Sequence, residues 1–156
     1  MNRDIWMILL GSLLAFSGGL ASFFIQTWWH RKLIKNNTLN LLKWMIGSIS
    51  SVISRIEETY EKTNLLWNDL LYQISLDLTI FEQNREISLI SVNPSIRQQV
   101  YDWCMKTRTN TSLSLGLNQM LLSNPQNDWV KNDIPQKIQL FKELKNDASK
   151  LIEKLK

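Results

Sequence analysis

The sequence has little of what most catalytic and metal-binding sites are built from. Among 156 residues there is one histidine, His30, and one cysteine, Cys104. This pair can form neither an intramolecular disulfide nor an ordinary zinc site, and the chain has no phosphate-cradling glycine loop, GxSxG motif or paired-histidine metalloprotease motif. We therefore expect a protein that is not an enzyme and has no cofactor or metal. His30 is interpreted as an interfacial polar residue and Cys104 as a small buried one.

Glycine and proline are also scarce, at five and three residues. Three of the glycines fall in the first hydrophobic stretch, so the rest of the chain has few breakers, which favours helices over short strands. The net charge of +4 is concentrated in residues 1–35, where four Lys or Arg residues face one Asp. This placement argues against duplex nucleic acid as a partner, because a nucleic-acid-binding domain carries its positive charge on its own folded surface.

A long uncharged run opens the chain. No charged residue occurs in the 21 positions from Ile5 to Ile25, enough for a helix about 30 Å long, the thickness of a bilayer core. A cleaved signal peptide is the competing interpretation, but the run is longer than a usual signal core and Trp28-Trp29 resembles an interfacial anchor. The basic residues His30-Arg31-Lys32 and Lys35 follow, so the N-terminus is predicted outside and the remainder in the cytoplasm.

Small residues lie on one face of this predicted span. Gly11, Ala15, Gly18 and Ser22 recur at three- and four-residue spacing, and we call them the small-residue face. In lipid such faces let helix backbones approach closely. Since a single span has no partner within its own chain, the face predicts self-association.

The expected fold is all-α, with residues 1–35 as a transmembrane anchor and residues 36–156 as a cytoplasmic helical bundle. Apolar residues follow a seven-residue rhythm from Leu42 to Phe81. The rhythm fits one very long helix or two helices that fold back near Thr63-Asn64, and we favour the break. Leu39–Ile56 could be a second span, but Lys43, Arg55 and four serines favour an amphipathic helix in a bundle.

Later boundaries are marked by turn and capping residues. Ile87–Val92 is rich in branched residues and could be a short extended piece, and Asn93-Pro94 predicts a helix start. The polar run Lys106–Ser112 predicts an interruption of that helix, after which Leu113–Leu122 resumes it. The last helix is predicted to start at Asp133-Ile134-Pro135, with an apolar stripe along the rest of the chain.

The best candidate for binding is the polar run itself. As a turn before a helix it would offer Lys106, Arg108, Thr109, Asn110 and free backbone N–H groups, which suit phosphate oxygens. Trp103, one helical turn earlier, could stack on a base. A solvated turn between helices is the alternative. The acidic residues Glu57, Glu58 and Glu61 are interpreted as a solvated helix face.

The layout of the whole chain resembles the small membrane effectors of type III CRISPR systems. The resemblance rests on the span Ile5–Ile25, the basic collar His30-Arg31-Lys32 and a helical domain of matching size. It implies an antiviral protein of the bacterial inner membrane, a homo-oligomer such as a tetramer that binds a cyclic oligoadenylate and disturbs the membrane. Lys106, Arg108 and Asn110 would then contact the ligand. The alternative is a membrane-bound scaffold, sensor subunit or immunity protein that binds another protein through an exposed apolar groove.

Overall fold

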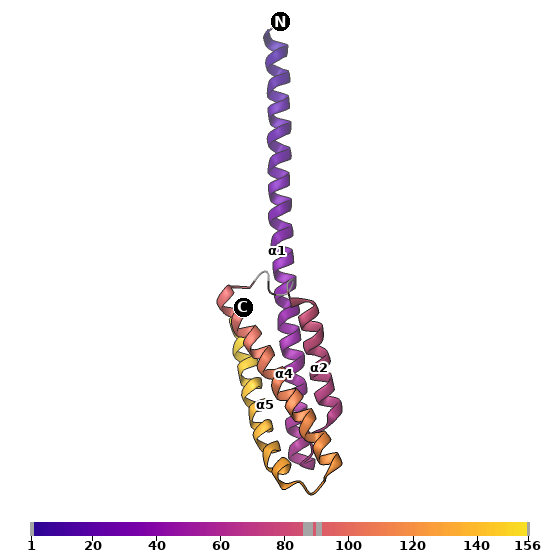
Figure 1. The fold of residues 1–156 in the computed structure, drawn as a ribbon. Coiled ribbons are helices and arrows are strands. Elements are labelled where there is room, and N and C mark those ends of the chain that lie inside the picture. The colour runs from indigo at the N-terminus through magenta and orange to yellow at the C-terminus, as the bar shows by residue number, and fades with distance from the viewer. Residues whose placement is uncertain (1, 86–88, 90–91, 156) are drawn as a thin grey trace. The chain divides into compact units, whose positions relative to one another are not determined.

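Helices make up nearly all of the chain. A computed structural model describes residues 2–85, 89 and 92–155, without the side chains of residues 2–6, 8–13 and 15. The helices are α1 (Asn2–Thr63), α2 (Asn68–Gln83), α4 (Pro94–Ser123) and α5 (Asp128–Lys154), shown in Figure 1. No strand occurs in the described part of the chain. The prediction of an all-α fold is confirmed.

The chain divides into two units, residues 1–37 and residues 38–156, and α1 contributes to both. In the first unit the described apolar side chains are exposed, Phe16 at 70%, Phe24 at 66% and Trp29 at 64%. Lys32 lies over the ring of Trp28, with Nζ 5.1 Å from the ring centroid. Among the described residues, no helix offers a stretch apolar and long enough to cross a bilayer. Much of the predicted span lies outside the described side chains, including Gly11 and Ala15.

The second unit is a four-helix bundle made by residues 38–63 of α1 with α2, α4 and α5. Helix α4 packs against both α2 and α5. Helix α1 is tied to α2 by a hydrogen bond from the Ser48 hydroxyl to Asp77 (3.0 Å), and to α5 by an ion pair between Glu57 and Lys145. All four helices supply fully buried side chains to one core, among them Ile46, Ile53, Leu71, Ile74, Val100 and Phe141.

The seven-residue rhythm predicted this core well. Most of its positions between Leu42 and Phe81 are buried, and the segment Leu39–Ile56 packs in the bundle as an amphipathic helix. The predicted break is also confirmed. Helix α1 ends at Thr63, and Asn64 takes a left-handed conformation with φ of 54°, which asparagine tolerates better than most residues.

Capping residues set the other helix boundaries. At the predicted start of α4, the Asn93 side chain accepts a hydrogen bond from Ser95 N (3.0 Å) and Pro94 occupies the first turn. The predicted start of α5 at Asp133 is wrong, because α5 begins five residues earlier at Asp128. Asn127 caps it by accepting from Val130 N (3.4 Å), and Pro135 lies inside the helix on its exposed side.

The predicted interruption at Lys106–Ser112 is also wrong, since α4 continues through it to Ser123. The hydroxyls of Thr107, Thr111 and Ser114 each donate to the carbonyl four residues earlier at 2.8 Å, and all three residues are buried. These polar side chains are thus satisfied by their own helix and allow close packing within the bundle. Most of the predicted extended piece Ile87–Val92 lies outside the described residues.

Candidate functional site: an apolar hollow at one end of the bundle

The residues predicted to bind phosphate do not form a loop, and two of them are part of the core. Trp103 is 3% exposed and its indole N–H donates to the Leu144 carbonyl at 2.8 Å, so its ring is not free to stack on a base. Asn110 is 4% exposed and donates to the Lys137 carbonyl at 3.2 Å. Because the segment lies within a helix, its backbone N–H groups are not those of a helix start, and that premise of the prediction is wrong.

The remaining predicted residues lie on different faces of α4. Arg108 forms an ion pair with Glu82 of α2, and Thr109 is exposed. Lys106 lines a cleft of about 240 Å³ between α4 and α5, together with Lys150, Lys154 and two aspartates. The structure therefore brings Lys106 together with two other lysines and with Trp103, which also lines this cleft, and separates it from Arg108, Thr109 and Asn110.

The acidic residues of α1 face α5 as well as solvent. Glu57 is 9% exposed and pairs with Lys145, and Glu61 pairs with Lys142 at 3.6 Å. One Glu57 oxygen, Oε1, is buried and has no hydrogen-bond partner in the described part of the chain. The predicted solvated acidic face is therefore partly wrong, because two of its glutamates join α1 to α5.

The buried cysteine behaves as predicted. Cys104 is 7% exposed, and removal from water raises the pKa of its thiol from 9.0 to about 12. Two nearby charges have smaller effects on this pKa: Arg108 lowers it and Glu82 raises it. The thiol is thus protonated at neutral pH and a poor nucleophile. Within the described residues, no group of three or more histidine, cysteine, aspartate or glutamate side chains could hold a metal ion.

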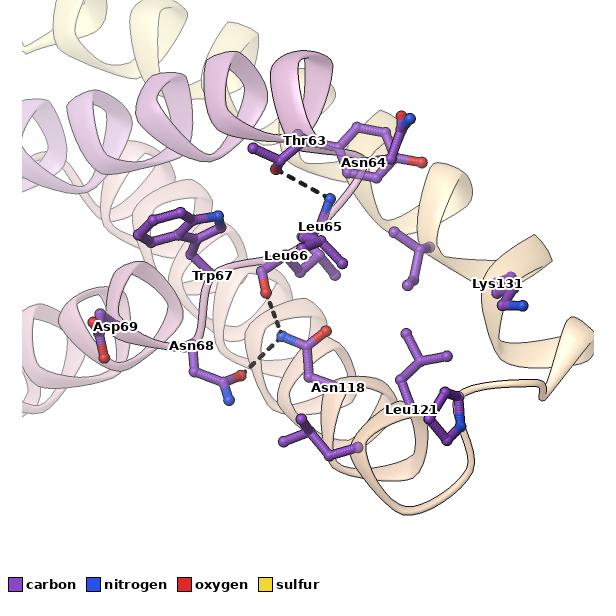
Figure 2. Close-up of a pocket in the computed structure, with 14 residues that line it drawn as sticks. Thr63, Asn64, Leu65, Leu66, Trp67, Asn68, Asp69, Asn118, Leu121 and Lys131 are labelled. Atoms are coloured by element: carbon purple, nitrogen blue, oxygen red, sulfur yellow. Dashed lines mark hydrogen bonds between the residues drawn. The ribbon is translucent and has the colours of Figure 1, made fainter.

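A large opening in the described part of the bundle lies at the end where α1 turns into α2. We call it the hollow. It has a volume of about 840 Å³, and Figure 2 shows its lining. The side chains come from the end of α1, the α1–α2 turn, the first turn of α2, the last turns of α4, the α4–α5 loop and the start of α5: Tyr60, Thr63, Asn64, Leu65, Leu66, Trp67, Asn68, Asp69, Asn118, Leu121, Leu122, Pro125, Lys131 and Ile134.

The α1–α2 turn forms one wall of the hollow. Asn64 N donates to the Tyr60 carbonyl (2.8 Å), and the Thr63 hydroxyl oxygen accepts from Leu65 N (3.3 Å). With Asn64 left-handed, this arrangement closes α1 and reverses the chain within a few residues. Leu65 is 58% exposed, whereas Leu66 is 7% exposed and packs inward.

Asn118 belongs to the floor of the hollow. It is 7% exposed, and its amide nitrogen donates to the Leu66 carbonyl and to Asn68 Oδ1, both at 2.8 Å. Figure 2 shows the Asn118 oxygen turned away from these two bonds, toward the side where Leu121 and Lys131 lie. One asparagine of α4 thus holds the α1–α2 turn in place and presents an acceptor to the hollow.

The sequence contained a signal for this site that composition alone did not reveal. Three positions in the seven-residue rhythm, Tyr60, Thr63 and Trp67, are not fully buried, and all three line the hollow. The apolar stretch Leu113–Leu122 likewise contains two amides, Asn118 and Gln119, of which Asn118 lines the hollow. Each is a departure from the pattern that the surrounding helix follows, and together they mark the end of the core.

Comparison with known proteins adds no assignment. Neither a protein-family model nor a curated protein nor a solved structure matches this chain. Function is therefore inferred from the residues described above.

Proposed function

We propose that this chain is a membrane-attached binding protein whose helical bundle holds an apolar ligand in the hollow. The observation that carries the proposal is an opening of about 840 Å³ with mainly apolar walls at the end of a bundle whose core is otherwise buried. Sites for small ligands are commonly concave, mostly apolar and supplied with a few directed polar groups. The hollow has these properties, and Asn118 supplies such a polar group.

Membrane attachment is supported by the first unit. The sequence from Ile5 to Ile25 carries no charge, and the described apolar side chains of this unit are exposed along the helix. Exposed phenylalanine and tryptophan in a row are costly in water and favourable in a bilayer. The basic collar with Lys32 over Trp28 suits the headgroup region, and it favours the cytoplasmic side for the bundle.

The exposed rim of the hollow also supports binding. Leu122 is 76% exposed, Leu65 58% and Trp67 50%. Isolated apolar side chains on a surface need no explanation, but three around one apolar opening form a patch of the kind that marks binding sites.

A matched pair of tryptophan variants tests the hollow. Leu121→Trp adds volume inside it, whereas Leu113→Trp makes the same change on the same helix at a 50% exposed position that does not line it. Full-length protein in lipid nanodiscs is titrated with 1-anilinonaphthalene-8-sulfonate, and the signal of empty nanodiscs is subtracted. We expect wild type and Leu113→Trp to bind the dye alike and Leu121→Trp to bind it weakly. Equal binding by all three folded proteins contradicts the proposal.

Membrane attachment is tested separately by alkaline carbonate extraction of membranes from cells that express the full chain. An inserted anchor keeps the protein in the pellet, because carbonate strips proteins held only by charge or by partners. Release into the supernatant contradicts an inserted anchor.

The expected binding of a cyclic oligonucleotide stays a prediction. Of the residues named for it, Lys106 and Trp103 line the cleft with Lys150 and Lys154, where anionic oxygens would meet three lysines and two aspartates. A Lys106→Ala variant that binds a cyclic oligoadenylate as tightly as wild type would remove this cleft from consideration.

A further inference from the structure

We infer that the hollow takes a small, uncharged, amphipathic molecule that donates one hydrogen bond, from a hydroxyl or an N–H group, to the side-chain oxygen of Asn118. This inference rests on the proposed function and names the class of its ligand. Three features of the hollow carry it, namely the orientation of Asn118, the size and polarity of the lining, and its balance of charge.

The orientation of the Asn118 amide is set by its neighbours. A backbone carbonyl only accepts hydrogen bonds, so the group that contacts the Leu66 carbonyl at 2.8 Å must be the amide nitrogen of Asn118. The second hydrogen of that nitrogen is used by Asn68 Oδ1. The oxygen is therefore fixed on the opposite side of the amide group, as Figure 2 shows.

This oxygen is an acceptor at the surface of the hollow. No hydrogen bond to Asn118 Oδ1 is found among the described residues, and the side chain is 7% exposed. The fully buried side-chain oxygens without a partner in the described part of the chain are Glu57 Oε1 and Asn110 Oδ1, so Asn118 Oδ1, which is not one of them, keeps contact with the open volume of the hollow. Because both hydrogens of the amide nitrogen are committed, the side chain holds this oxygen in place for a donor. A ligand with an O–H or N–H group satisfies the oxygen without disturbing the turn that Asn118 holds.

The rest of the lining favours an apolar molecular body over a peptide. Leu66 and Ile134 are 7% and 4% exposed, and they form the inner surface together with Leu121. A peptide segment would bring several backbone N–H and C=O groups into this surface, where Asn118 is the one buried polar side chain. A volume of about 840 Å³ is within the range of sites for small molecules.

The charges on the lining balance. The hollow has one cation, Lys131, and one anion, Asp69, which Figure 2 shows on opposite sides. Lys131 also faces Asp128 at 3.8 Å and is 52% exposed, so its charge is shared with a carboxylate and with water. Neither sign of charge dominates, which favours a neutral ligand.

A pair of ligands in which a methyl group replaces the hydroxyl hydrogen, and so removes the hydrogen-bond donor, tests the inference. Decanol and decyl methyl ether displace the dye from full-length protein in nanodiscs, and each affinity is corrected for partition into empty nanodiscs. We expect decanol to bind wild type about tenfold more tightly than the ether, the effect of one hydrogen bond to an acceptor on a largely buried side chain. Equal corrected affinities overturn the inference, and this comparison needs no variant.

Two variants assign the preference to Asn118. Asn118→Leu removes the acceptor, so the preference for decanol over the ether should fall to about twofold or less. A preference for decanol that persists unchanged in this variant overturns the inference. Asn68→Ala is the matched control, since it removes one bond of the Asn118 amide and keeps the oxygen, so the preference should remain. Loss of the preference for decanol in this variant also overturns the inference, because the hydrogen bond that Asn118 donates to the Leu66 carbonyl should by itself orient the oxygen.

The two proposals fail in different ways. If Leu121→Trp and wild type bind the dye equally, the proposed function fails. If the dye binds in the hollow but neither decanol nor the ether displaces it, the hollow is a binding site and the ligand class is wrong, as expected for a partner protein that inserts apolar side chains.

Discussion

The ion pair between Glu57 and Lys145 gives a sharp test of how the bundle is held together. Glu57 lies on α1 and Lys145 on α5, and their side chains are 11% and 31% exposed. Replacing Lys145 by methionine keeps the apolar part of the side chain and leaves the Glu57 carboxylate without its cation. Removing one partner of a fully buried pair costs about 3–5 kcal/mol. Since Lys145 is partly solvated, we expect Lys145→Met to lower the free energy of unfolding by about 2 kcal/mol.

The same two helices offer a matched control. Lys142 and Glu61 also join α5 to α1, at 3.6 Å, but their side chains are 41% and 66% exposed. Exposed pairs contribute about 0–1 kcal/mol, so Lys142→Met should change the free energy of unfolding by less than about 1 kcal/mol. Comparing Lys145→Met with Lys142→Met tests the effect of burial on the energy of the ion pair, because the residue types and the two helices are the same.

Urea unfolding of the full chain in a fixed detergent, followed by far-UV circular dichroism, measures these differences. A double variant with Glu57→Gln and Lys145→Met removes the uncompensated charge and should recover part of the loss. Equal destabilisation by Lys145→Met and Lys142→Met, or a double variant as unstable as the sum of its two single variants, would refute the reasoning.

Three further predictions concern other parts of the chain. Trp103→Phe should destabilise the bundle by about 1–3 kcal/mol because it leaves the buried Leu144 carbonyl without its donor, whereas Trp129→Phe, at a 65% exposed position, should have no effect in the same unfolding assay. Since the pKa of Cys104 is raised in the fold from 9.0 to about 12, its protonated thiol contributes stability below pH 9 that is lost as the pH rises toward 12; Cys104→Ala should remove this part of the pH dependence of unfolding. Leucine at the first three positions of the small-residue face should weaken association in chemical cross-linking. A Cβ atom at Gly18 would meet nothing within 4 Å beyond its chain neighbours and the backbone of its own helix, so unchanged cross-linking would remove the face as a contact between copies.

Much of the bundle could be predicted because its sequence signals are local. The seven-residue rhythm identified the buried face of α1 and α2, and Asn64 and Asn93 marked the end of α1 and the start of α4 through their own backbone and side-chain preferences. Burial of Cys104 followed from the chemistry of a lone thiol. These features depend on residues a few positions apart, which a sequence displays directly.

The errors came from polar residues whose partners are not visible in a local window. Thr107 and Thr111 bond to their own helix and are buried, so a run that composition marks as a turn is the middle of α4. Asn127 starts α5 before Pro135, which the helix tolerates on its exposed side. The hollow was missed because it is formed by Asn118 meeting the α1–α2 turn some 50 residues away in sequence.

Photoaffinity labelling shows directly whether the hollow is the ligand site. A diazirine analogue of decanol is irradiated with the full-length protein in nanodiscs, and the labelled residues are mapped by mass spectrometry. We expect labels in residues 60–69 and 118–134 that excess decanol suppresses and that Leu121→Trp reduces. Labels confined to residues 1–37, or spread over the bundle without competition by decanol, would contradict the claim.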